Sequence, residues 1–212
     1  MTDLILALDV TEKKSALSIA HECSPHLDAI KVGYPLILSA GLSIAQELET
    51  EDLPLIADFK VADIPNTNRL IAEQVFDAGF SSIICHGFTG KDAVQACVDA
   101  AADYGGSCFV VAEMSHPGAT EFFYGGTAEK IAHLAIECGA DGIIAPATRP
   151  ERVKVLRDIV GNRKILSPGV GVQGGDIDKI VKLVDGIIVG RAIYESDNPG
   201  NAAEGFASIR SK

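Results

Sequence analysis

Hydrophobic residues occur in short runs rich in β-branched side chains, and segments with helical spacing lie between the runs. The runs predict eight strands: Leu4–Asp9, Ala29–Val32, Leu55–Lys60, Ser82–Cys85, Cys108–Ala112, Gly142–Ala145, Lys164–Ser167 and Gly186–Val189. The intervening segments predict these helices: Lys13–Glu22, Asn66–Ala78, Lys91–Ala102, Ala128–Cys138, Pro150–Ile159, Asp176–Leu183 and Asn201–Ile209. Gly79, Gly105, Gly139 and Gly161 stand where glycine commonly ends a helix, which supports these boundaries.

The strands are nearly continuous apolar runs, which is typical of parallel strands covered on both faces. Eight strand–helix units over 1–212 predict one domain with the α/β fold of a (β/α)₈ TIM barrel, eight parallel strands surrounded by helices. An open, doubly wound sheet is the alternative. The turn after the first strand reads DVTEKK, however, and lacks the glycines of a dinucleotide-binding turn.

Charged side chains stand at the predicted carboxyl ends of several strands. Asp9 ends the first strand, Lys31 the second, and Asp58 and Lys60 the third. Unpaired charges are costly inside a core, and active-site groups of a TIM barrel gather where its strands end. These residues therefore predict an active site at the barrel mouth.

The stretch ADFKVADIP places three charges at the end of the third strand. Because side chains two residues apart share a face of a strand, Asp58 and Lys60 point the same way and Phe59 points oppositely. With Lys31 from the neighbouring strand, they predict an alternating Lys–Asp–Lys–Asp series that includes Asp63. The alternatives are a simple ion pair for Asp58 and Lys60, and a helix cap before Pro65 for Asp63.

Two glycine-rich stretches predict a phosphate site. SPGVGVQGG, residues 167–175, follows the seventh strand, and IIVGRAI, residues 187–193, contains the eighth. The loops after these strands commonly bind phosphate in TIM barrels, where backbone N–H groups approach the anion. Arg191 adds a fork of donors for phosphate oxygens.

The long segment MSHPGATEFFYGGT, residues 114–127, predicts a lid over the mouth, with an ordinary surface loop as the alternative. His116 within it receives no role. His86, after the fourth strand, is a weak candidate for supporting the charged residues.

Composition narrows the functional classes. The net charge of −11 argues against non-specific binding to nucleic acid. The longest apolar runs are too short to cross a membrane, and the amino-terminal stretch lacks the features of a signal peptide. The five cysteines show neither CxxC nor zinc-ligand spacing, so we expect free thiols in a protein of the cytoplasm.

Taken together, these motifs resemble the orotidine 5′-monophosphate decarboxylase family in its short, barrel-only form typical of archaea. DFKVADIPNT resembles the family's DxKxxD signature, and the likeness covers the whole chain. The other matching stretches are LALDV, IKVG, HGF, EMSHPG, TRPERV, SPGVGVQGGD and IIVGRAIY. DxKxxD alone is shared with related phosphosugar enzymes, whereas EMSHPG together with PGVGVQGG is more specific.

The resemblance implies catalytic roles. Lys60 is implied as the acid that protonates C6 of the pyrimidine, Asp58 lies against the substrate carboxylate, and Lys31 bridges Asp58 and a ribose hydroxyl. Asp63 would enter the partner's site in a homodimer, together with Ile64 and Thr67.

The same resemblance implies a substrate-binding set with the following members: Asp9, Lys31, Ile64, Thr67, Ser115, Pro168, Gln173, Gly190 and Arg191. Asp9 would bind ribose, Ser115 and Gln173 the base, and Gln173, Gly190 and Arg191 the phosphate.

The implied reaction is the decarboxylation of orotidine 5′-monophosphate to UMP. Because no cofactor or metal motif is present, the protein itself is expected to stabilise the carbanion at C6 electrostatically. Two other functions stay open: a sister phosphosugar enzyme that uses Mg²⁺, and a non-catalytic nucleotide-binding barrel.

Overall fold

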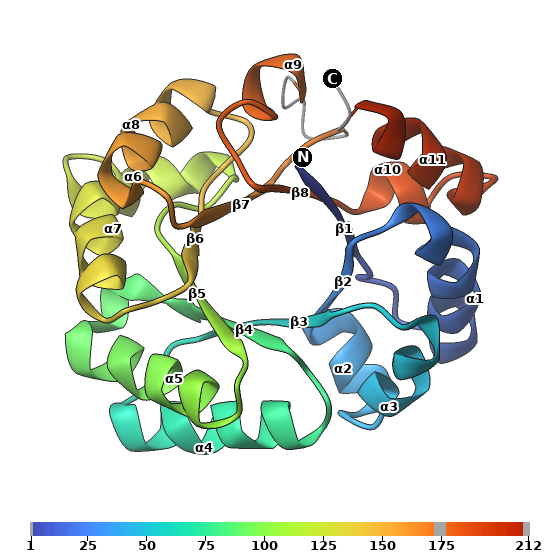
Figure 1. The fold of residues 1–212 in the computed structure, drawn as a ribbon, viewed down its shortest axis with the longest axis horizontal. Coiled ribbons are helices and arrows are strands. Elements are labelled where there is room, and N and C mark those ends of the chain that lie inside the picture. Colours follow the sequence, from blue (N-terminus) through green and yellow to red (C-terminus); the bar gives the residue numbers. More distant parts are fainter. Residues whose placement is uncertain (1, 172–176, 210–212) are drawn as a thin grey trace.

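The computed structural model describes residues 2–171 and 177–209. Eight parallel strands pair in sequence order and close into a barrel when β8 pairs with β1 (Figure 1). Their bounds are β1 Asp3–Ala7, β2 Ala29–Gly33, β3 Leu55–Val61, β4 Ser82–His86, β5 Ser107–Val111, β6 Gly142–Ile144, β7 Lys164–Pro168 and β8 Gly186–Val189. The predicted (β/α)₈ barrel is confirmed, and the open sheet is excluded by its closure.

Helices form an outer ring around the strands (Figure 1). Those that the sequence predicts are α1 Lys13–Cys23, α4 Pro65–Asp77, α5 Lys91–Asp103, α7 Thr127–Glu137, α8 Pro150–Val160 and α11 Pro199–Ile209. The helix predicted over 176–183 is found as a shorter α9, Ile177–Ile180. Within the described ranges, four short α-helices were not predicted: α2 Tyr34–Ala40, α3 Ile44–Leu48, α6 Thr120–Phe123 and α10 Arg191–Tyr194.

Two apolar layers hold the barrel together. Alternate residues of each strand face outward and pack under the helices, as Leu4 and Leu6 do in β1. The residues between them face inward and fill the barrel: Ile5, Ala7, Ala29, Ile56, Ile84, Phe109, Val111, Ile144, Leu166 and Ile188. This filling makes the barrel interior a packed core and not a pore.

Strand β3 departs from regular geometry where it carries its charges. Its register with β4 shifts between Ala57 and Val61, and Lys60 has a left-handed backbone with φ +45°. A non-glycine residue in that region stores roughly 1–2 kcal/mol of strain. Despite the irregularity, Phe59 packs in the outer layer against Phe80, as the strand alternation predicts.

Candidate active site

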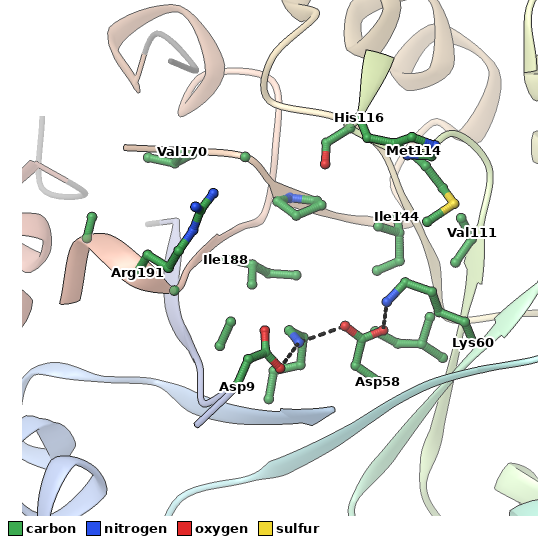
Figure 2. Close-up of a pocket in the computed structure, with 18 of the residues that line it drawn as sticks. Asp9, Asp58, Lys60, Val111, Met114, His116, Ile144, Val170, Ile188 and Arg191 are labelled. Carbon is green, nitrogen blue, oxygen red and sulfur yellow. Dashed lines mark hydrogen bonds and ion pairs between the residues drawn. The ribbon is translucent and has the colours of Figure 1, made fainter. Parts of the chain in front are cut away.

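A cavity of about 320 Å³ opens at the carboxyl ends of the strands (Figure 2). Its floor consists of apolar side chains from the barrel interior: Ala7, Ile84, Val111, Ile144 and Ile188. Polar side chains surround this floor at the mouth. An apolar cavity with a few converging polar groups is the usual form of a small-molecule site.

One wall of the cavity carries three closely spaced charges, here called the charged array: Lys31, Asp58 and Lys60. The two carboxylate oxygens of Asp58 lie 2.6 Å from Nζ of Lys31 and 2.7 Å from Nζ of Lys60 (Figure 2). Asp9 extends the array, with Oδ1 lying 3.6 Å from Nζ of Lys31. Asp58 and Lys60 therefore share a face, as predicted, and belong to a larger ionic group than a simple pair.

The backbone of β2 makes room for Asp9. Gly33 follows Lys31 by two residues and faces the same side of the strand. A Cβ atom at Gly33 would lie 2.7 Å from Oδ1 of Asp9, closer than real contacts allow. Glycine at this position lets Asp9 approach the array.

Attraction within the array outweighs the cost of burial. Burial alone disfavours the Lys31 ammonium, but Asp58 and Asp9 reverse this effect and raise its pKa above the ordinary value. Burial likewise disfavours ionised Asp58, yet Lys31 and Lys60 lower its pKa below the ordinary value. At neutral pH the cavity wall thus presents ionised groups held in fixed positions.

The opposite wall contains part of the predicted phosphate site. Arg191 lies across the mouth from Lys60 (Figure 2). Pro168 and Gly190 also line the cavity. Gly169 and Gly171 have left-handed backbones, with φ of +101° and +82°. Gln173 lies outside the described residues.

The segment after β5 forms the third side of the cavity. Met114, Ser115 and His116 line it, so the predicted position of Ser115 at the mouth holds. The rest of the segment folds into a 3₁₀ helix, Pro117–Ala119, and the short helix α6. The proposed lid function stays a prediction.

Asp63, Ile64 and Thr67 do not line the cavity of their own chain. Asp63 lies beyond β3 and Ile64 is 65% exposed. The carboxylate of Asp63 accepts a hydrogen bond of 2.7 Å from the backbone N–H of Ile64. Helix α4 begins at Pro65 with Ile64 as its N-cap, so the alternative of Asp63 as the cap is wrong.

His86 is the last residue of β4 and is buried. Burial, with a further contribution from the charge of Lys60, lowers the pKa of His86 to about 4. Its Nδ1 atom is buried and has no hydrogen-bond partner among residues 2–171 and 177–209. His86 is therefore neutral at physiological pH. It is not among the residues that line the cavity.

Sequence reasoning missed two features of the site. Tyr194 lines the cavity; it follows Arg191 by three residues, and helical spacing within α10 could have placed the two on one face. The second feature is an ion-pair cluster around Glu113, which the sequence does not reveal because the partners of Glu113 are far along the chain.

The described residues contain neither a group of metal ligands nor a helix that could span a membrane. Within 2–171 and 177–209, three or more His, Cys, Asp or Glu residues nowhere form a group suited to a metal ion. Over the same residues, every helix is too short or too polar to cross a membrane.

Known proteins resemble the chain over nearly its full length. The model of the family described as "Orotidine 5'-phosphate decarboxylase / HUMPS family" matches residues 2–206. The chain is 58% identical over 203 residues to the orotidine 5′-phosphate decarboxylase of Methanococcoides burtonii, a match that spans 95% of this chain and 94% of that relative. Identity to the Thermococcus kodakarensis enzyme of the same name is 51% over 203 residues, spanning 94% and 92%.

Solved structures show the same relationship. Orotidine 5′-monophosphate decarboxylase from Methanocaldococcus jannaschii, complexed with the inhibitor BMP, matches with a TM-score of 0.96 and 44% identity over 100% of both chains. The Pyrococcus horikoshii enzyme matches with a TM-score of 0.90 and 45% identity over 99% of both chains. The chain therefore belongs to the orotidine 5′-phosphate decarboxylase / HUMPS family, as the resemblance of its motifs predicts.

Proposed function

We propose that this chain, as one domain over residues 1–212, decarboxylates orotidine 5′-monophosphate to UMP and CO₂ in pyrimidine synthesis without a cofactor. Family membership and the names of the relatives support this activity. The observation that carries the proposal is the charged array, which faces Arg191 across an apolar cavity. Such a cavity suits a ligand with a phosphate at one end and a reacting carboxylate at the other.

In the proposed reaction, the bond between C6 and the carboxylate breaks, CO₂ leaves, and the electron pair stays on C6. The ammonium group of Lys60 stabilises this developing charge and then transfers a proton to C6. The neutral amine regains a proton from water. Support comes from the 2.7 Å contact between Asp58 and Lys60, which holds the ammonium in place before reaction, so that little reorganisation is needed.

Asp58 has a second proposed role, against the carboxylate of the substrate. Both of its oxygens are already engaged by lysines, and burial restricts its access to water. A substrate carboxylate beside this anion would be destabilised until CO₂ departs. Binding energy from the remote phosphate, held by Arg191, would offset that cost.

We assign the remaining predicted residues as substrate contacts. Asp9 and Lys31 would bind the ribose, Ser115 and Gln173 the base, and Gln173, Gly190 and Arg191 the phosphate. Pro168 would be a further contact with the substrate. All of these except Gln173 lie among the described residues, and each of those lines the cavity.

The proposal includes a homodimer in which Asp63, Ile64 and Thr67 reach the partner's site. Three large side chains that follow consecutive strands are exposed, and this supports a surface that a second chain covers. They are Tyr34, Ile64 and Phe88, at 50%, 65% and 61% exposure. Mixing Asp63→Asn chains with Lys60→Ala chains would then create one intact site per heterodimer. Verified heterodimers without recovered activity would contradict the shared site.

The decisive experiment adds EDTA-treated protein to orotidine 5′-monophosphate and measures turnover as the loss of substrate absorbance. Turnover should persist. Lys60→Ala should lower it by at least about three powers of ten, because it removes both a preorganised charge, which contributes about 10²–10³, and the proposed proton donor, which contributes about 10²–10⁴. Lys164→Ala, an exposed lysine at the other end of the barrel, is the matched control and should stay active. Activity lost on EDTA treatment and restored by Mg²⁺ would favour a sister phosphosugar enzyme; ligand binding without turnover would favour a non-catalytic barrel.

The proposed location is the cytoplasm. All five cysteines are buried as free thiols, which supports a reducing compartment. Sγ of Cys85 lies 3.7 Å from Sγ of Cys108, too far for a disulfide bond.

A further inference from the structure

A second ionic group lies behind the segment that follows β5, here called the Glu113 cluster: Glu113, Arg149, Arg152 and Glu129. The side chain of Glu113 is completely buried. Its Oε1 accepts a bond of 2.8 Å from Nε of Arg149, and its Oε2 accepts one of 2.9 Å from Nε of Arg152. A buried carboxylate is costly to desolvate, and well-packed apolar residues often give equal stability. The ionic group therefore favours a role in positioning neighbouring residues.

Arg149 connects the cluster to the backbone of the cavity wall. Its guanidinium donates to the carbonyl oxygen of Met114 and, at 3.5 Å, to that of Ser115. The hydroxyl of Thr148 also donates to the Ser115 carbonyl at 3.2 Å. Two consecutive carbonyls are thus directed away from the cavity by side chains of the segment between β6 and α8, while Ser115 lines the cavity.

Arg152 connects the same cluster to the far end of the segment. Its Nη1 lies 2.7 Å from Oε1 of Glu129, near the start of α7, and its guanidinium lies 5.3 Å from the ring centre of Tyr124. Glu129 and Glu113 raise the pKa of Arg152, which keeps it charged. One buried carboxylate therefore organises both ends of the segment 114–127.

The opposite wall of the cavity has separate support. Gly190 and Arg191 lie where β8 leads into α10, and none of the hydrogen bonds described for the Glu113 cluster reaches them. A change in the cluster is therefore expected to move one wall and leave the other in place.

We propose that Arg149 and Glu113 are positioning residues that hold the Ser115 turn against the base of the bound nucleotide, so that the base is recognised independently of the phosphate. This inference rests on the proposed function, because it takes the ligand to be a pyrimidine nucleotide. Arg149 acts through the Met114 and Ser115 carbonyls and makes no contact with the ligand itself. The fork shape of its guanidinium is required, since a lysine has no planar pair of donors.

The test compares calorimetric binding of UMP with that of ribose 5-phosphate, which lacks the base. Arg149→Lys and Arg149→Met should weaken UMP binding about 10- to 100-fold and change ribose 5-phosphate binding less than about twofold. The matched control is Arg157→Lys in helix α8, which begins directly after Arg149. Arg157 also binds a carboxylate and backbone carbonyls, but they belong to Asp185, Leu183, Gly161 and Arg163, away from the cavity. It should leave both affinities unchanged.

Thr148→Val keeps the inference testable if the arginine variants do not fold, because it removes a single donor to Ser115 and preserves side-chain shape. It should weaken UMP binding severalfold, again without affecting ribose 5-phosphate. Equal losses for the two ligands, or no loss in any folded variant, would overturn the inference. A wild-type protein that binds UMP no better than ribose 5-phosphate, or does not decarboxylate, would instead overturn the proposed function.

Discussion

Replacing Asp58 by asparagine tests the charged array as a structural unit. The carboxylate of Asp58 is 12% exposed and engages two ammonium groups, while Lys31 is 5% exposed. The substitution leaves Lys31 buried, with Asp9 at 3.6 Å as the remaining carboxylate. Breaking a buried pair on one side typically costs about 3–5 kcal/mol, so we expect a loss of that size in the free energy of unfolding.

Urea unfolding at pH 7.5, followed by circular dichroism, measures this loss as a lower midpoint at unchanged slope. The matched control is Asp103→Asn, which removes the 57% exposed partner of Arg69 and should cost below about 1 kcal/mol. The double variant Lys31→Met with Asp58→Asn removes the stranded charge and should recover most of the loss. If Asp58→Asn cost no more than Asp103→Asn, or if the double variant were less stable than the single one, our account of the array would be refuted.

Two further changes probe the phosphate wall and the buried histidine. Arg191→Ala should raise KM about 10²-fold by removing roughly 2–4 kcal/mol of charge-assisted hydrogen bonds, and steady-state kinetics with an unchanged KM would show that the phosphate binds elsewhere. Because the pKa of His86 is lowered to about 4, the unfolded chain binds the extra proton first as pH falls. The free energy of unfolding therefore keeps the full contribution of neutral His86 above about pH 6.5 and loses it as the pH falls towards 4. This loss is at most roughly 3 kcal/mol before solvent screening. Urea unfolding of His86→Gln should show a weaker pH dependence over that window, and an unaltered one would contradict the assignment.

The sequence predicted the barrel and most of its mouth because both depend on periodic patterns. Alternation along β3 placed Asp58 and Lys60 on one face, and the order of strands placed Lys31 beside them. The register shift before Val61 and the left-handed backbone at Lys60 were not predicted, because a run of β-forming residues indicates a strand but not a local irregularity within it. The prediction of the shared face survived because the irregularity preserves the alternation.

Short or distant features escaped sequence reasoning for other reasons. Helix α2 has seven residues and α3 five, too few to show a clear helical period. In the sequence, nothing distinguishes Glu113 from other polar residues that follow a strand. Its bonds to Arg149 and Arg152 span more than thirty positions along the chain. Such pairings follow from how β5, β6 and α8 pack together, which a single sequence does not specify.

Closure of the barrel between β1 and β8 links ligand binding to folding. These strands lie at opposite ends of the chain, so their pairing carries the largest loop-closure entropy of any neighbouring pair and is expected to form late. Asp9 follows β1, and Arg191 follows β8, so the groups proposed for ribose and phosphate meet across this seam. A nucleotide that contacts both would stabilise the closed barrel by about 2.7 kcal/mol at 100 times its Kd. The substrate would then protect the junction of the first and last strands from local opening.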